Sequence, residues 1–197
     1  DRAMRWFLSA RQVVVSALVA ATMTVVLTLT LDVRLPVPSL VGYAAGIPAA
    51  LLICAGIASL VLATLAQGNP GLETTAVRRM GGYELGLVLG LASLSLVPLI
   101  LASIAGKPAA VPTRNLVGFI AIGLIARYLV GRQLASFAPV AAMVLVAVLG
   151  KRTNEILAWP LADGDSGTSA ATVLALEAVG LALGFIRQRG WPLQARG

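Results

Sequence analysis

The residues most able to do chemistry in this chain are its eight acidic side chains, because the sequence contains no histidine and a single cysteine, Cys54. Glu177 stands out among them because it lies inside an otherwise apolar run. Gly180 and Gly184 follow it three and seven positions later, so the three residues share one face of a helix. A carboxyl group in apolar surroundings is costly and usually faces neighbouring helices or a wet cavity. Two roles for Glu177 stay open: a group on a substrate or proton path, or an acid that locks its helix to a neighbour.

A second group of charged residues lies in the segment 67–84, QGNPGLETTAVRRMGGYE, which is the only long polar interruption in the first 105 residues. An Asn-Pro turn and a later Gly-Gly pair predict a short helix between them. Glu73 at the start of this helix and Arg78 and Arg79 at its end complement the helix dipole. Together with Glu84, these residues are the candidate contact for a soluble partner.

The other large polar segment is 151–167, KRTNEILAWPLADGDSG. Trp159 and its apolar neighbours make the middle amphipathic, so we expect it to lie on a membrane surface or to dip into the membrane. Asp163 and Asp165 lack the ligand pattern of a calcium loop and instead predict a turn and a helix cap.

Several kinds of site are excluded by what the sequence lacks. Without histidine there is no serine–histidine triad, no histidine-containing zinc site and no histidine-ligated haem. The single Cys54 allows neither a disulfide framework nor a cysteine metal site. No G-x-x-x-x-G-K-[ST] phosphate loop occurs, so the chain is not itself an ATPase. We expect no metal, no cofactor and no catalytic residue in the chain.

The composition is that of a membrane protein. Of the 197 residues, 58% are hydrophobic and only 12% are charged, whereas soluble domains are about a quarter charged. Backbone groups in lipid must be paired within the protein, and continuous hydrophobicity favours helices over a barrel. We therefore predict an all-α membrane protein with six transmembrane helices. The predicted spans are 13–31, 40–66, 82–104, 115–130, 134–150 and 168–186.

Around these spans the chain divides simply. Residues 1–12 carry Arg2, Arg5 and Arg11 beside aromatic side chains, which predicts an interfacial helix with its cations in water. Residues 13–187 form one six-helix transmembrane domain, and residues 188–197 form a tail.

The connections and glycines give further expectations. We predict a simple turn in DVRLPVPS, a bend near Pro48, and a loop in GKPAAVPTRN that is interrupted by Pro108 and Pro112. A tight turn at Gly131 separates the fourth and fifth spans. The i, i+4 glycines of the third span predict a face on which another helix packs closely. These glycines are Gly82, Gly86 and Gly90.

The distribution of positive charge predicts the orientation. The two ends of the chain, the segment 67–84 and the turn at Gly131 carry ten of the fifteen lysines and arginines, and the other side carries five. Cytoplasmic loops are enriched in lysine and arginine, so both termini should be cytoplasmic, in a bacterial plasma membrane. The same rule explains the net charge of +7 without a nucleic-acid partner.

A resemblance to a known family adds to this interpretation. The segments GLETTAVRRM, PTRNLVGFIAIGLIARYLVGRQLASFAPVAAMVL and ILAWPLADG are similar to those of ABC-2-type exporter permeases, in particular small actinobacterial permease-like proteins encoded beside ABC ATPases. The resemblance implies a permease that pairs with a second copy or a paralogue and binds a cytoplasmic ABC ATPase, with ATP held by that partner. It places Glu73, Arg78 and Arg79 in the coupling loop and Trp159 to Asp165 in an extracellular segment.

Two alternatives to an exporter permease stay open. The first is the substrate-binding subunit of a vitamin-type importer, which also has about six helices and uses a separate ATPase module. The second is a non-transporting accessory or immunity protein of a larger membrane complex. Binding of a small vitamin by the isolated chain favours the first, and the absence of any compound that stimulates an ATPase favours the second.

Overall fold

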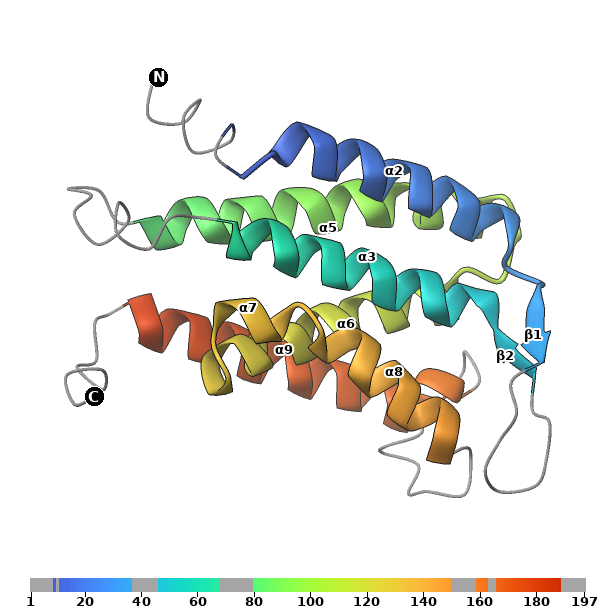
Figure 1. The fold of residues 1–197 in the computed structure, drawn as a ribbon. Coiled ribbons are helices and arrows are strands. Elements are labelled where there is room, and N and C mark those ends of the chain that lie inside the picture. The colour runs from blue at the N-terminus through green and yellow to red at the C-terminus, as the bar shows by residue number, and fades with distance from the viewer. Residues whose placement is uncertain are drawn as a thin grey trace.

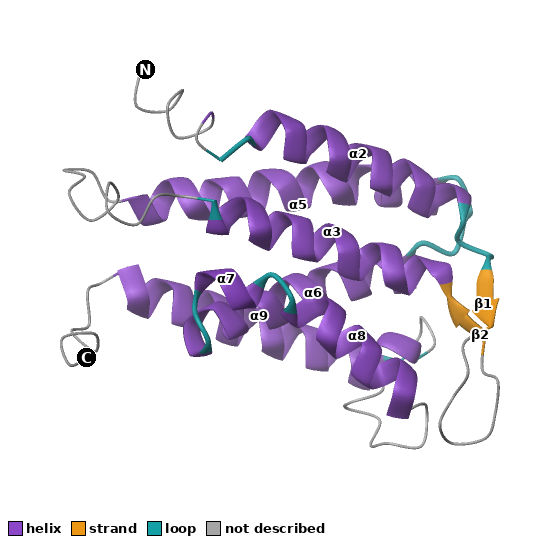
Figure 2. Cartoon of the chain, viewed as in Figure 1, coloured by secondary structure: helices purple, strands orange, loops and turns teal. Residues whose placement is uncertain are grey.

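The structure, a computed structural model, describes residues 9, 11–36, 46–67, 80–149, 159–162 and 166–188. This part of the chain is mostly helical, with two very short strands (Figure 2). Its elements are α2 (Val13–Leu29), β1 (Arg34–Pro36), β2 (Gly46–Pro48), α3 (Ala49–Ala66), α5 (Met80–Ile104), α6 (Ala110–Leu129), α7 (Arg132–Ala135), α8 (Ala138–Leu149), the 3-10 helix η2 (Trp159–Leu161) and α9 (Gly167–Gln188).

The long helices lie side by side, and their direction alternates along the chain (Figure 1). Helices α2 and α5 begin at the end of the bundle where α3, α6 and α9 finish. This end contains Glu84 and is called the Glu84 end below. The opposite end carries the two strands and is called the hairpin end.

Three helices are long and apolar enough to cross a membrane. They comprise Ala49–Ala66, Glu84–Ile104 and Ala110–Leu129, and each has 18 residues or more. At 1.5 Å per residue, 20 residues cover the ~30 Å of a hydrocarbon core. Three further apolar segments of 10–17 residues are Val13–Leu29, Ala138–Val148 and Gly167–Leu183. The prediction of a helical chain with apolar spans is confirmed in this form.

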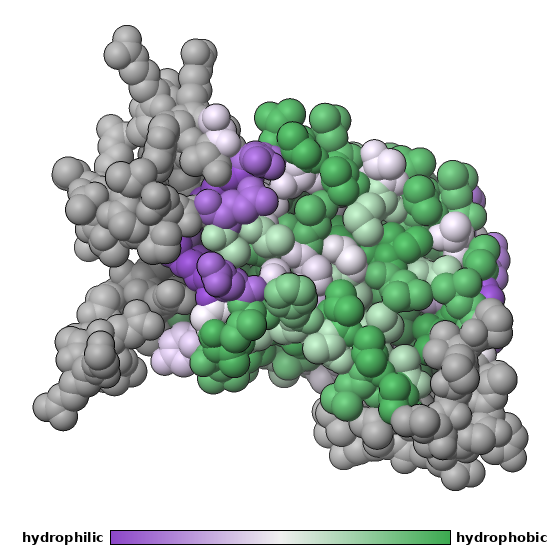
Figure 3. All heavy atoms as spheres, in the orientation of Figure 1, coloured by the Kyte–Doolittle hydropathy of each residue, from purple (hydrophilic) through white to green (hydrophobic). Residues whose placement is uncertain are grey.

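Much of the outer surface of the bundle is apolar. Large aliphatic side chains on the outer faces of α2, α5 and α9 are mostly exposed, among them Val14, Leu18, Leu29, Ile104 and Leu174. Figure 3 shows apolar residues over the middle of one face and hydrophilic residues gathered toward the Glu84 end. Exposed apolar patches of this extent are unfavourable in water but not in lipid, so the surface fits a membrane protein.

Helix α3 is the centre of the core. It packs against α2, α5, α6 and α8, and most of its side chains are buried. Small residues such as Ala55 and Ala58 let its neighbours approach closely. On α6, the side chain of Leu62 occupies the space that a Cβ at Gly123 would fill.

A β-hairpin replaces the simple turn that we predicted between the first two spans. Strands β1 and β2 pair antiparallel, with Arg34 opposite Pro48 and Leu35 opposite Ile47. Helix α3 begins directly after Pro48, so the prediction of a helix that passes through this residue with a bend is wrong. The reason is local: proline lacks the N–H that a helix interior requires and disfavours helical geometry in the residue before it.

The prediction for the connection between α5 and α6 is also wrong in part. Helix α6 begins at Ala110, inside the segment predicted to be a loop. Pro112 lies in its first turn, where the missing N–H has no intrahelical partner to lose. The tight turn at Gly131 is confirmed, because this glycine has a φ of 92° and directly precedes α7.

The glycine face of α5 packs against no other helix in the described part of the chain. A Cβ placed at Gly86 or Gly90 meets nothing within 4 Å. Helix α5 instead faces the bundle with buried aliphatic residues, among them Leu87, Leu91 and Leu99. In the described part of the chain, no helix packs on Gly86 or Gly90, and the surroundings of Gly82 lie outside the described residues. The larger apolar side chains of α5 bury more surface than the glycines would.

One glycine of α6 does have a clear packing role. The Trp159 ring of η2 lies against Gly118, and a Cβ there would overlap the ring. The same ring packs on Phe119 with centroids 5.6 Å apart and an interplanar angle of 55°. Gly118 thus leaves a space on α6 that the Trp159 ring fills.

Replacing Gly118 tests this packing. Gly118→Ala should lower the free energy of unfolding in detergent by about 1–3 kcal/mol, because the rigid ring must move. Gly90→Ala is the matched control and should raise it by about 0.5–1 kcal/mol, since open space surrounds Gly90. In a Trp6→Phe, Trp191→Phe background, Trp159 emission should shift to the red in the first variant alone. Equal effects of the two alanines would contradict this packing role.

Candidate functional site: a glutamate bound by three arginines

The most concentrated polar site in the described residues is built around Glu84. Helix α5 begins at Met80, so Glu84 lies in its second turn, inside the predicted span 82–104, and is not part of the connecting loop to which the segment 67–84 also assigned it. The Gly-Gly pair that we expected to end a loop helix belongs to the first turn of α5. The position of Glu84 on a helix directs its carboxylate toward the neighbouring helices.

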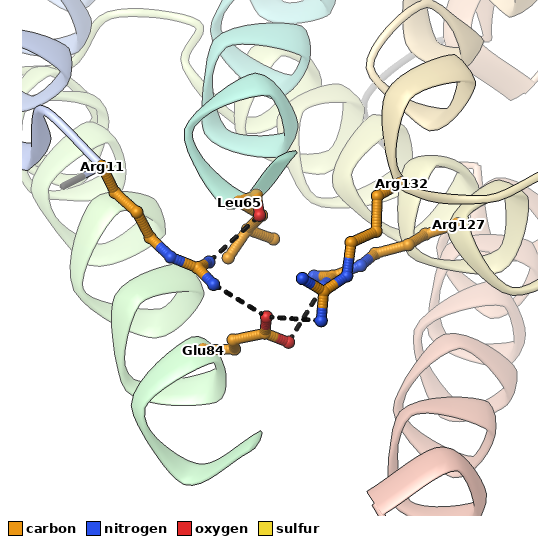
Figure 4. A network of polar contacts seen from close by, with 5 residues as sticks. All are labelled: Arg11, Leu65, Glu84, Arg127 and Arg132. Atoms are coloured by element: carbon orange, nitrogen blue, oxygen red, sulfur yellow. Dashed lines mark hydrogen bonds and ion pairs between the residues drawn. The ribbon is translucent and has the colours of Figure 1, made fainter. Parts of the chain in front are cut away.

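Three arginines from different parts of the chain contact this carboxylate (Figure 4). Arg11 Nη2 lies 3.0 Å from Glu84 Oε1, and Arg127 Nη2 lies 2.9 Å from Oε2. Arg132 Nη2 lies 3.2 Å from Oε1. The site therefore joins the segment before α2 to the starts of α5 and α7 and to the last turn of α6.

Arg11 also binds the end of α3. Its Nη1 donates a 3.0 Å hydrogen bond to the carbonyl oxygen of Leu65. This carbonyl belongs to the last turn of α3, where carbonyl groups lack intrahelical partners and the helix dipole attracts a cation. A single guanidinium group thus satisfies a helix end and a carboxylate at once, which its planar array of donors allows.

The burial of Arg11 contradicts our prediction that it points into water. Its side chain is 1% exposed, against 11% for Arg127 and 25% for Arg132. The backbone turns sharply next to it, since Gln12 has a φ of 48° and donates to Ser9 O. A left-handed residue other than glycine costs about 1–3 kcal/mol, which the two contacts of Arg11 offset.

The chemistry open to this site is limited. Within the part of the chain that the structure describes, the side chains that contact the carboxylate are three arginines, and their guanidinium groups repel a metal ion. No group of three His, Cys, Asp or Glu that suits a metal occurs in the described residues. Arginine stays protonated and so offers no proton for acid–base catalysis. The geometry suits a mechanical connection between helices better than catalysis.

A second polar cluster holds η2 at the hairpin end. Arg114 Nη2 donates to the carbonyl oxygens of Trp159 and Ala162 at 3.0 and 2.7 Å. Asn115 Nδ2 donates to Pro160 O at 2.9 Å. Trp159, expected to lie on or near the membrane surface, is buried against α6, because these bonds satisfy the carbonyls of its segment.

Glu177 lies on α9, outside both clusters. It is half-buried, and in the described part of the chain no hydrogen bond or ion pair reaches its carboxyl group. Glu73, Arg78 and Arg79, and likewise Asp163 and Asp165, lie outside the described residues. Of the predicted contact residues, only Glu84 lies in the described part of the chain. The structure brings it together with three of the arginines whose distribution predicts the orientation.

Comparison of the chain with protein-family models, with curated proteins and with solved structures gives no match. The resemblance to ABC-2-type permeases rests on the sequence segments quoted above.

Removal of the Glu84 charge should destabilise the bundle more than removal of any one arginine contact. Glu84→Gln leaves three cations in a partly buried site, and we expect a loss of about 3 kcal/mol in the free energy of unfolding in detergent. Arg132→Gln, at the most exposed partner, should cost about 1 kcal/mol or less. Equal stability of Glu84→Gln and the unmodified chain would show that the cluster does not stabilise the fold.

Proposed function

We propose that this chain is a membrane-embedded permease subunit of an ABC-type exporter. It couples ATP hydrolysis by a partner subunit to the movement of a hydrophobic or amphipathic compound. The observation that carries the proposal is the Glu84 site, which ties four chain segments together beside the connection between α3 and α5. The quoted sequence segments support the choice of family.

The proposed topology has six spans with both termini in the cytoplasm of a bacterial cell. The alternating helices support it: α2, α3, α5, α6, the α7–α8 pair and α9 each run from one end of the bundle to the other. Arg11, Arg127 and Arg132 meet at the Glu84 end, and the excess of positive charge along the sequence assigns this end to the cytoplasm. The short helices accommodate a bilayer by local thinning, at a modest cost.

The Glu84 site gives the proposed coupling a physical route. Residues 68–79 connect the end of α3 to the start of α5 at the Glu84 end. Arg11 binds both the last turn of α3 and Glu84, and Glu84 binds the end of α6 and the start of α7. A partner that moves this connection would move all of these helix ends together, since ion pairs at 3 Å permit little independent motion.

The partners follow from the same proposal. The sequence has no phosphate loop, so ATP is bound by a cytoplasmic ABC ATPase that contacts Glu73, Arg78 and Arg79. A second copy of the chain or a paralogue completes the permease, and membrane lipid surrounds it. Sparse charge on the described helices favours a substrate with a large apolar part.

Purification from native membranes tests the ATPase contact. An ABC ATPase should copurify with the chain, and Arg78→Glu with Arg79→Glu should abolish its recovery, because the charges at the contact are reversed. The matched control is Arg34→Glu with Lys107→Glu, two exposed cations at the hairpin end, which should leave recovery unchanged. Unchanged copurification in the first variant would rule out this contact. Glu84→Gln should retain the ATPase and lose stimulation of its activity by transported compounds.

Two other results would favour the rival functions. Tight binding of a small vitamin by the isolated chain would indicate an importer subunit. Recovery without any ATPase, together with an intact fold, would indicate an accessory protein.

Cysteine labelling tests the topology. In a Cys54→Ser background, Ser9→Cys at the Glu84 end should be labelled by a membrane-impermeant maleimide only after the cells are opened. Lys107→Cys at the hairpin end should be labelled in intact cells, because this exposed residue is assigned to the outer side. The reverse pattern, or labelling of both from one side, would exclude the six-span orientation.

A further inference from the structure

Glu177 lies beside the middle of α6. The two helices run in the same direction (Figure 1), and a Cβ at Gly180 would lie 3.4 Å from the carbonyl oxygen of Ala121. Glu177 is about one turn before Gly180, and Ala121 is near the centre of α6 (Ala110–Leu129). The carboxyl group is therefore far from both polar ends of this helix pair.

No positive charge of the described chain pairs with Glu177. The ionisable residues of α6 are Arg114, Arg127 and Tyr128, and they lie toward its two ends. Arg114 binds carbonyl oxygens of the η2 segment, and Arg127 binds Glu84. The element η2, which also packs on α9, has no ionisable side chain. On α9 itself, Arg187 is ten positions away, about 15 Å along the helix.

The immediate surroundings of Glu177 are apolar and open to the outside of the bundle. Leu174 and Leu181, about one helical turn before and after it, are exposed, and so is Ala178 between them. Val173 on the inner side is buried. The carboxyl group is thus placed between two apolar side chains on a surface that an incoming molecule can reach.

The carboxyl group, unpaired within the described residues, and its apolar neighbours determine which kind of ligand Glu177 can bind. A carboxylate in apolar surroundings is stabilised by a proton or by a positive charge. A small metal ion would require several further oxygen ligands, which the leucines and alanines here do not supply. An organic cation brings its charge to the carboxylate and its apolar body to the leucines, and it reaches this surface through the membrane.

We propose that Glu177 is the anionic centre of a binding site on α9 for a lipophilic organic cation. As the substrate class of the transporter, this inference rests on the proposed function. The binding site itself does not require an ATPase.

Equilibrium dialysis against the purified chain tests the site. Tetraphenylphosphonium should bind saturably to the chain in uncharged detergent micelles, with protein-free micelles as the blank. Glu177→Gln should weaken binding about tenfold or more, as expected for loss of a charge-assisted contact. Glu177→Asp should retain most of the affinity, because the charge is kept. Asp32→Asn removes an exposed acid outside α9 and should bind like the unmodified chain.

The charge of the ligand and the pH of the solution provide two further tests of the site. Tetraphenylborate has the same shape and the opposite charge, so in separate samples it should not bind in a Glu177-dependent way. Binding of the cation should weaken as the pH falls, because protons compete for the carboxylate, and Glu177→Gln should lose this dependence. Equal binding by the Gln variant and the unmodified chain would overturn the proposal.

A change of oligomeric state in Glu177→Gln without cation binding would also overturn it and assign the carboxyl to a contact between subunits. The dialysis contains no ATPase, so a negative result leaves the permease proposal standing. Loss of the ATPase contact likewise leaves a positive binding result intact.

Discussion

A carboxylate inside an apolar bundle must be neutralised by groups that the protein or its surroundings provide. At Glu84 the protein provides three guanidinium groups, and the resulting ion pairs connect the helix ends at this end of the bundle. The four segments that supply Arg11, Glu84, Arg127 and Arg132 are fixed to one another at one end. The apolar contacts of α3 hold the middle together but have little direction, whereas these short ion pairs define how the helix ends are placed.

The two acids on long helices illustrate opposite solutions to this constraint. Glu84 is near a bundle end and is satisfied from within the chain. Glu177 is beside the middle of α6 and has no partner in the described residues. The difference follows from where arginines can be placed: they occur near helix ends, where their long side chains remain close to water, and are costly in the centre. A group that pairs with Glu177 must therefore come from elsewhere.

Features that depend on neighbouring residues could be predicted from the sequence, whereas contacts between distant residues could not. The first and last spans were predicted as 13–31 and 168–186, close to the observed α2 and α9, because long apolar runs have visible ends. The turn at Gly131 was predicted because adjacent charges exclude a continuous span. The hairpin was missed because three-residue strands have no measurable periodicity. The contact of Arg11 with Glu84 was missed because 73 positions separate them.

That separation has a consequence for the order of assembly. The chain is made from its N-terminus, so Arg11 is already present when Glu84 is synthesised. Arg127 is still absent at that stage, because it lies 43 positions further along the chain. The first three long helices can thus associate through Oε1 of Glu84 and Leu65 O alone. Oε2 can bind Arg127 only after α6 has been made and has packed against the earlier helices. Arg132 adds a second contact to Oε1, so the complete set of ion pairs at Glu84 forms only when both halves of the bundle have packed together.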